Sequence, residues 1–228
     1  MDLQENVFER TNDSCWFKEI CKRDNSCNAC AKYKEFAYLM ESSNLPKAKQ
    51  RQIVLQTPKV DLAAYERLAD IKQDMYDFVS SGKSLYIGSL TVGNAKTSWA
   101  IKLMHRYFEE VWENNGFTPR ALFVHVPSFL MQFKNFKTID EDFEELKKLL
   151  FNIDLVIWDD ITGMDLSAYD YSVLLSYIDY RSLAELSNIY TGNAVTREEL
   201  GNMVGVKIAS RILARTTEVI LFEGLDYR

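Results

Sequence analysis

The sequence Ser84-Leu-Tyr-Ile-Gly-Ser-Leu-Thr-Val-Gly-Asn-Ala-Lys-Thr-Ser98 joins a short apolar run to a glycine-containing turn and then to a helical pattern. The run 85–87 has the character of a buried strand, and apolar residues recur at helical spacing from Trp99 onward. A strand, a glycine turn, Lys96-Thr97 and a helix together form the layout of a phosphate-binding P-loop. This stretch therefore predicts an α/β protein with a phosphate site at the start of a helix.

The residues expected to contact a bound nucleotide follow from this layout. They are Gly93, Asn94, Ala95, Lys96, Thr97 and Ser98. Backbone N–H groups of such a loop and the N-terminus of its helix hold the phosphates. The ammonium of Lys96 is expected on the outer phosphates, and the hydroxyl of Thr97 is expected to ligate Mg²⁺.

The amino-acid sequence of the loop departs from the P-loop consensus G-x-x-x-x-G-K-[ST]. Leu90 occupies the first glycine position, Gly88 comes two residues early, and Ala95 precedes the lysine. Glycine suits these places because the backbone approaches the phosphates in conformations that a Cβ disfavours. A strained alanine costs about 1–3 kcal/mol, or roughly tenfold to hundredfold in affinity. Hydrolysis depends on phosphate position and is the more vulnerable property.

A second chemical marker is Leu155-Val-Ile-Trp-Asp-Asp160, an apolar strand that ends in two acids. This is the form of a Walker B element, in which Asp159 holds Mg²⁺ and Asp160 polarises the attacking water. The alternative is that both acids only begin a turn or cap a helix. The P-loop stretch upstream favours the Walker B interpretation.

From residue 61 onward, strands and helices alternate, which predicts a parallel sheet with helices on both faces. We expect Asp61 to cap one continuous helix that runs through Val79. The predicted organisation is a small helical module at 1–45, a basic, Gln-rich linker at 46–60 and an ATPase domain at 61–228.

All four cysteines fall within one short window, at Cys15, Cys21, Cys27 and Cys30. Four thiolates match a closed tetrahedral structural zinc site, and the terminal C-x2-C supplies a tight knuckle. Two disulfides, or unrelated buried thiols, are the alternatives, and disulfides are disfavoured in a reducing compartment. A three-cysteine site with an outside ligand also remains open, because the x5 spacings are loose.

The net charge and the hydropathy of the sequence limit which partners and which cellular locations are expected. The net charge of −6 over 228 residues argues against general electrostatic coating of nucleic acid, although local basic patches can still contact phosphates. No apolar run approaches the length of about 18 residues that a membrane helix needs. The N-terminus lacks the basic-then-apolar form of a signal peptide, so a cytoplasmic protein is expected.

The order of these motifs resembles the AAA+ ATPases, and within them the DnaC/DnaI-like helicase loaders. The phage type is the most similar, because Gly93-Asn-Ala-Lys-Thr-Ser-Trp-Ala100 looks like its Gly-Asn-Gly-Lys-Thr-Ser-Trp-Ala signature. A cysteine-rich N-terminal module is also typical of these loaders. The resemblance implies a five-stranded sheet in the order 5-1-4-3-2, with little or no helical lid, in a phage-encoded protein of the bacterial cytoplasm.

The resemblance also implies roles for single residues. Asp159 would be the Walker B acid, Asp160 the catalytic acid and Asn193 sensor 1. Arg215, or Arg211 one turn earlier, would be the arginine finger presented to a neighbouring subunit. Arg228 would stand where a sensor 2-like arginine binds nucleotide. For each arginine, a solvated surface charge is the alternative.

Three functions follow as hypotheses. The first is a helicase loader that responds to ATP or ADP with Mg²⁺, self-associates, and binds a DnaB-type replicative helicase and single-stranded DNA. The second, motivated by Ala95, is a nucleotide-defective adaptor or inhibitor that acts on the helicase or on the host loader. The third is a transposition helper ATPase of the IstB type, against which the cysteine module argues. ATP hydrolysis itself is left open.

Overall fold

The computed structural model describes residues 15–17, 21, 30–55, 59–111, 116–134, 140–214 and 217–224. Five strands form one parallel sheet: β1 (Ser84–Gly88), β2 (Ala121–His125), β3 (Leu155–Asp159), β4 (Ser187–Gly192) and β5 (Thr217–Leu221). Their order is β2-β3-β4-β1-β5, which is the expected order 5-1-4-3-2 read from the opposite edge. The predicted α/β class and sheet order are therefore confirmed.

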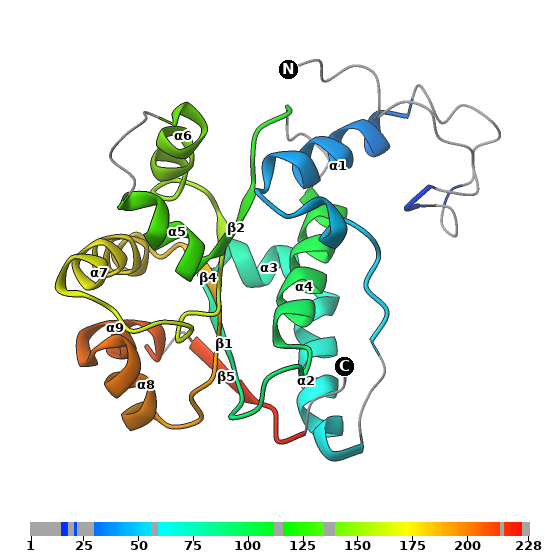
Figure 1. The fold of residues 1–228 in the computed structure, drawn as a ribbon. Coiled ribbons are helices and arrows are strands. Elements are labelled where there is room, and N and C mark those ends of the chain that lie inside the picture. Colours follow the sequence, from blue (N-terminus) through cyan, green and yellow to red (C-terminus); the bar gives the residue numbers. More distant parts are fainter. Residues whose placement is uncertain are drawn as a thin grey trace.

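Helices cover both faces of the sheet (Figure 1). One layer holds α1 (Ala31–Ser42), α2 (Leu62–Gln73), α3 (Met75–Ser80) and α4 (Lys96–Val111). The opposite layer holds α5 (Val126–Phe133), α6 (Glu141–Leu149), α7 (Ala168–Leu183), α8 (Arg197–Val204) and α9 (Val206–Ile212). Two short 3-10 turns, η3 (Lys47–Lys49) and η4 (Lys59–Asp61), precede α2.

Strands β2 and β3 are apolar at nearly every position because each face of the sheet contributes to a separate core. In β3, Leu155 and Ile157 belong to the core beneath α1–α4, whereas Val156 and Trp158 belong to the core beneath α5–α9. Successive side chains on a strand point to opposite faces, so the two cores share one sheet. The continuous apolar runs of the sequence are thereby explained.

The helix expected from Asp61 through Val79 is in fact two helices. The chain breaks at Asp74, whose φ of −138° and ψ of 66° are not helical and whose carboxylate accepts a hydrogen bond from Asp77 N, thereby capping α3. The carboxylate of Asp61 makes no cap hydrogen bond to α2. Instead, it accepts from the backbone N–H groups of Glu223, at 2.7 Å, and Gly224, at 3.2 Å. Asp61 therefore ties the start of α2 to the chain that follows β5.

Helix α1 and the residues that follow it as far as Leu45 pack directly on the sheet and on α4. Phe36, Leu39 and Met40 of α1 are buried in the same core as the apolar face of α4. The main chain at Ser43 accepts from Phe123 N at 2.8 Å, and Asn44 Nδ2 donates to Phe123 O at 3.0 Å. These bonds cover the edge of β2, which would otherwise expose unpaired backbone groups. The domain boundary at residue 45 stays a prediction.

Candidate nucleotide site

The P-loop has a left-handed backbone at two positions before the lysine. Gly93 has a φ of 79° and Ala95 has a φ of 68°. Glycine adopts such angles readily, whereas an alanine is strained by roughly 1–2 kcal/mol in this region. The methyl group of Ala95 packs against the core on the α4 side, which offsets part of that strain. The loop thus holds a left-handed turn at residue 95 even though a Cβ is present.

Polar side chains of the loop bind one another. Lys96 Nζ donates to Thr91 O at 2.9 Å and to Asn94 Oδ1 at 3.0 Å. Asn94 is almost fully buried, and its Nδ2 donates to Thr91 Oγ1 at 3.0 Å and to Ser89 Oγ. Thr91 Oγ1 donates in turn to Gly224 O at 2.6 Å. The lysine is therefore positioned at the mouth of a loop whose interior is hydrogen-bonded.

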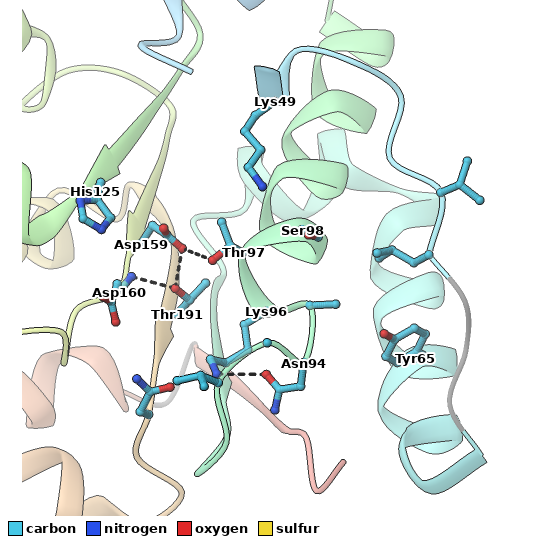
Figure 2. Close-up of a pocket in the computed structure, with 16 residues that line it drawn as sticks. Lys49, Tyr65, Asn94, Lys96, Thr97, Ser98, His125, Asp159, Asp160 and Thr191 are labelled. Atoms are coloured by element: carbon cyan, nitrogen blue, oxygen red, sulfur yellow. Dashed lines mark hydrogen bonds between the residues drawn. The ribbon is translucent and has the colours of Figure 1, made fainter. Parts of the chain in front are cut away.

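Thr97, Asp159 and Thr191 meet beside the loop (Figure 2). Thr97 Oγ1 donates to Asp159 Oδ1 at 2.6 Å, and Thr191 Oγ1 donates to the same oxygen at 2.8 Å. A hydroxyl and a carboxylate at this spacing suit Mg²⁺, which takes one or two carboxylates together with phosphate and water oxygens. The predicted pairing of Thr97 with Asp159 is thus present in the geometry.

Asp160 follows directly, with a φ of 56°. Its backbone N–H donates to Thr191 Oγ1 at 2.9 Å, so the threonine bridges both acids. A Cβ at Gly163 would collide with the carboxylate of Asp160, so only glycine leaves room for this side chain. Both acids face the same cavity.

Asn193, the expected sensor 1, lies just after β4 on the wall of that cavity. Its backbone N–H donates to Thr162 Oγ1 at 2.7 Å, which fixes the residue next to the turn that follows β3. Its Oδ1 is buried and has no hydrogen-bond partner among the described residues. A buried amide oxygen without a partner is costly, and a ligand or water donor in the cavity would satisfy it.

The cavity has a volume of about 970 Å³ and a polar and an apolar end. The polar end is lined by the loop residues 93–98 together with Asp159, Asp160, Thr191 and Asn193. The apolar end is lined by Val54, Leu55, Tyr65 and Val92. Tyr65 packs edge-on against Trp99, with ring centroids 5.1 Å apart, and burial raises its phenol pKa. The cavity can thus hold a ligand with phosphates at one end and a flat apolar group at the other.

Besides the apolar Val54, Leu55 and Val92, four residues with polar groups on this wall were not foreseen: Lys49, Tyr65, His125 and Thr191. Thr191 lies within the Thr-Gly-Asn that ends β4, and the register pairing Trp158 with Tyr190 places it beside Asp159. His125 is paired with Asp159 in the β2–β3 register and bonds Ser128 Oγ at 2.8 Å. Thr191 and His125 could both have been predicted by treating the polar residues at the carboxyl end of every strand as candidate site residues. Lys49 and Tyr65 carry no such signal.

The candidate finger arginines are not brought to the cavity within the described chain. Arg211 is half-exposed on α9, and its Nε donates to Asp179 Oδ1 on α7 at 2.5 Å. Arg215 and Arg228 lie outside the described residues. By contrast, Arg181 of α7 is fully buried, and its guanidinium donates to Asn188 Oδ1 and to four backbone carbonyl oxygens. Burial lowers its pKa to about 10.

The cysteines are described in part. Cys15 and Cys30 are half-buried free thiols, Cys21 is exposed, and Cys27 lies outside the described residues. Within the ranges that the structure describes, no three His, Cys, Asp or Glu side chains gather closely enough to hold a metal ion. The zinc site stays a prediction. Among the same residues, no helix combines the length and apolar character needed to cross a bilayer.

No protein-family profile and no curated protein matches this chain, but solved structures match it in fold. The DnaC helicase loader superposes with a TM-score of 0.60 at 18% identity, over 74% of this chain and 94% of that chain. DnaI gives 0.57 at 19% identity, over 81% and 94%. AMPPCP-bound DnaA from Aquifex aeolicus gives 0.53 at 17% identity, over 78% and 51%. The chain therefore has the AAA+ P-loop fold that these replication proteins share.

Proposed function

We propose that this chain, with the AAA+ fold of the DnaC and DnaI proteins, is an ATP-responsive helicase loader. The observation that carries nucleotide binding is the convergence of Lys96, Thr97 and Asp159 on one cavity that also has an apolar end. Lys96 would contact the outer phosphates, and Thr97 with Asp159 would hold Mg²⁺. Asp160 and Asn193 would orient the water that attacks the γ-phosphate.

The role in loading is supported by the likeness in fold to the DnaC helicase loader. We infer that a DnaB-type replicative helicase and single-stranded DNA are the partners. Self-association would bring Arg215 or Arg211 of one subunit to the nucleotide of the next, with Arg228 near its own. Arg211 is half-exposed on α9 and so is accessible to a neighbouring subunit.

A nucleotide-defective adaptor or inhibitor is the second candidate, and Ala95 favours it. The φ of 68° at this alanine places strain in the loop that binds phosphate. The transposition-helper alternative has no observation in its favour among the described residues. Pull-down against a helicase and against a transposase would separate it from the loader.

The first experiment measures binding of ATP with Mg²⁺ by calorimetry to the wild type and to Lys96→Ala. The loader predicts measurable binding that Lys96→Ala weakens by at least about 100-fold, because the lysine is the cation closest to the outer phosphates. Absent binding by the wild type would favour the adaptor. The second experiment measures single-stranded DNA binding by anisotropy, with and without ATP and a DnaB-type helicase. Nucleotide-independent DNA binding in both cases would contradict the loader.

Zinc is tested separately by elemental analysis of the purified protein. One zinc per chain, lost in the double variant Cys27→Ser, Cys30→Ser, is expected if the four cysteines form the site. Full loss of folding on chelation would be the stronger result, since structural zinc contributes folding energy directly.

A further inference from the structure

Lys49 lies on the wall of the nucleotide cavity, although it belongs to the linker that precedes the ATPase domain. Figure 2 shows its side chain extending from η3 into the cavity, on the side of Thr97 and Asp159. The side chain is exposed, and no hydrogen bond or ion pair joins its ammonium to another described residue. A cation therefore faces the polar end of the cavity without a partner in the described chain.

The backbone that carries Lys49 is held in place. Lys49 N donates to Pro46 O at 2.7 Å, and Gln50 closes the turn by donating from its backbone to Lys47 O and from Nε2 to Leu45 O at 2.9 Å. Leu45 is buried in the core beneath α1–α4. The turn is thus anchored to the same core as the P-loop helix, so the direction of Lys49 is set by packing.

The charges of the side chains that line the cavity indicate a role for Lys49. The cavity wall carries two carboxylates, Asp159 and Asp160, against the single cation of the loop, Lys96. Without Lys49, the fixed side chains of this wall would carry a net negative formal charge before any metal ion binds. With Lys49 the fixed charges cancel, and a mobile ammonium is available to any phosphate oxygen within reach.

We propose that Lys49 is a second phosphate-binding cation, which contacts the phosphate chain of the nucleotide from the η3 side of the cavity. This inference rests on the proposed nucleotide binding. If Lys49 contacts the phosphates, a bound nucleotide restricts the movement of the linker, because Lys49 is part of η3. Nucleotide state is thereby transmitted to the segment that joins residues 1–45 to the ATPase domain.

Calorimetric titration with ATP and Mg²⁺ tests the contact, with Lys47→Ala as the matched control. Lys47 lies in the same turn and is exposed, but does not line the cavity. We expect Lys49→Ala to weaken ATP binding about tenfold, the equivalent of about 1.4 kcal/mol. Lys47→Ala should change it less than about twofold, and Lys49→Arg, which keeps the cation, should restore affinity close to the wild type.

Limited trypsin digestion tests the coupling without relying on turnover. Arg51 follows Lys49 in the linker and is exposed. ATP with Mg²⁺ should slow cleavage after Arg51 in the wild type and in Lys47→Ala, but not in Lys49→Ala. Cleavage that nucleotide leaves unchanged in the wild type would overturn the coupling.

The outcomes separate the two proposals. If Lys96→Ala binds ATP as well as the wild type does, the nucleotide site itself is wrong. If Lys96→Ala abolishes binding while Lys49→Ala and Lys47→Ala behave alike, only the role of Lys49 is wrong.

Discussion

Thr97 Oγ1 donates a hydrogen bond of 2.6 Å to Asp159 Oδ1 across a separation of 62 residues. The same carboxylate oxygen accepts from Thr191 Oγ1, which in turn accepts from Asp160 N. The start of α4 and the ends of β3 and β4 are thus joined through one carboxylate. Parallel strands place their carboxyl ends at one edge of a sheet, and ligands of open α/β folds bind there.

Thr191 holds both acids, so its hydroxyl should contribute to stability. In Thr191→Val the N–H of Asp160 loses its acceptor and Asp159 loses a donor. We expect the free energy of unfolding to fall by about 1–3 kcal/mol, as urea denaturation would measure. Thr191→Ser keeps the hydroxyl and should lose less than about 1 kcal/mol. Equal losses in the two variants would show that the methyl group, not the hydroxyl, matters.

Thr97→Ala should expose the metal dependence of nucleotide binding. Removing the hydroxyl takes away one proposed Mg²⁺ ligand but leaves Lys96 and the loop backbone in place. We expect the affinity for ATP to fall about tenfold with Mg²⁺ present and to change little in EDTA. Ser98→Ala is the neighbouring control, since it removes a hydroxyl one residue away. An equal loss with and without Mg²⁺ would contradict the proposed role.

The Ala95→Gly variant tests whether the backbone strain at residue 95 lowers the stability of the fold or the affinity for ATP. The folded loop holds Ala95 at a φ of 68°, so the strain lowers the stability of the fold. Relief of about 1–2 kcal/mol is offset by a loss of about 0.4–1 kcal/mol from the more flexible unfolded chain. We expect the free energy of unfolding to rise by about 0–1.6 kcal/mol and ATP affinity to change less than about threefold. A gain above about tenfold would show that the Cβ itself obstructs the phosphate.

Arg181 and Arg211 offer a matched comparison, since both arginines contact polar partners near the same helix. Arg181→Leu would leave Trp158 Nε1 as the remaining donor to Asn188 Oδ1 and would remove the guanidinium from several buried carbonyl oxygens. We expect a loss of about 3–5 kcal/mol in the free energy of unfolding, or no folded protein. Arg211→Ala breaks a half-exposed ion pair with Asp179 and should cost less than about 1 kcal/mol. A similar cost for both would contradict the structural role of Arg181.

His105 of α4 predicts a stability change in weak acid. Its ring is buried, packs edge-on against Trp16 and leaves Nε2 without a partner among the described residues. Burial lowers its pKa from 6.5 to about 4. The unfolded chain therefore binds the proton first, and the stabilisation present above pH 6.5 is lost as the pH falls toward 4.

The loss due to this one group is about 3 kcal/mol at most. Thermal unfolding of the wild type and of His105→Phe between pH 7 and pH 4 measures it. The phenylalanine keeps the ring against Trp16 but cannot be protonated, so its stability should fall less over this range. Parallel curves for the two proteins would show that other groups cause the acid sensitivity.

The strand, loop and helix around Lys96, and the acids at the end of β3, could be predicted from the amino-acid sequence. The sequence also indicated, through the family resemblance, the order of the strands. These features are local, because strand and helix periods and turn residues act within a few positions of the chain. The conformation of Ala95 was also foreseen, since the site before the lysine demands an angle that favours glycine.

Only the tertiary structure decided which distant residues meet. Thr191 reaches Asp159 because of the register between β3 and β4, and Lys49 faces the cavity because Leu45 is anchored in the core. The prediction that Asp61 caps α2 was wrong, because its carboxylate accepts hydrogen bonds from the N–H groups of Glu223 and Gly224, about 160 positions away. Periodicity likewise could not separate Arg181, buried among carbonyl oxygens, from Arg211, left near solvent. Such contacts depend on how the whole core closes, and no local pattern carries that information.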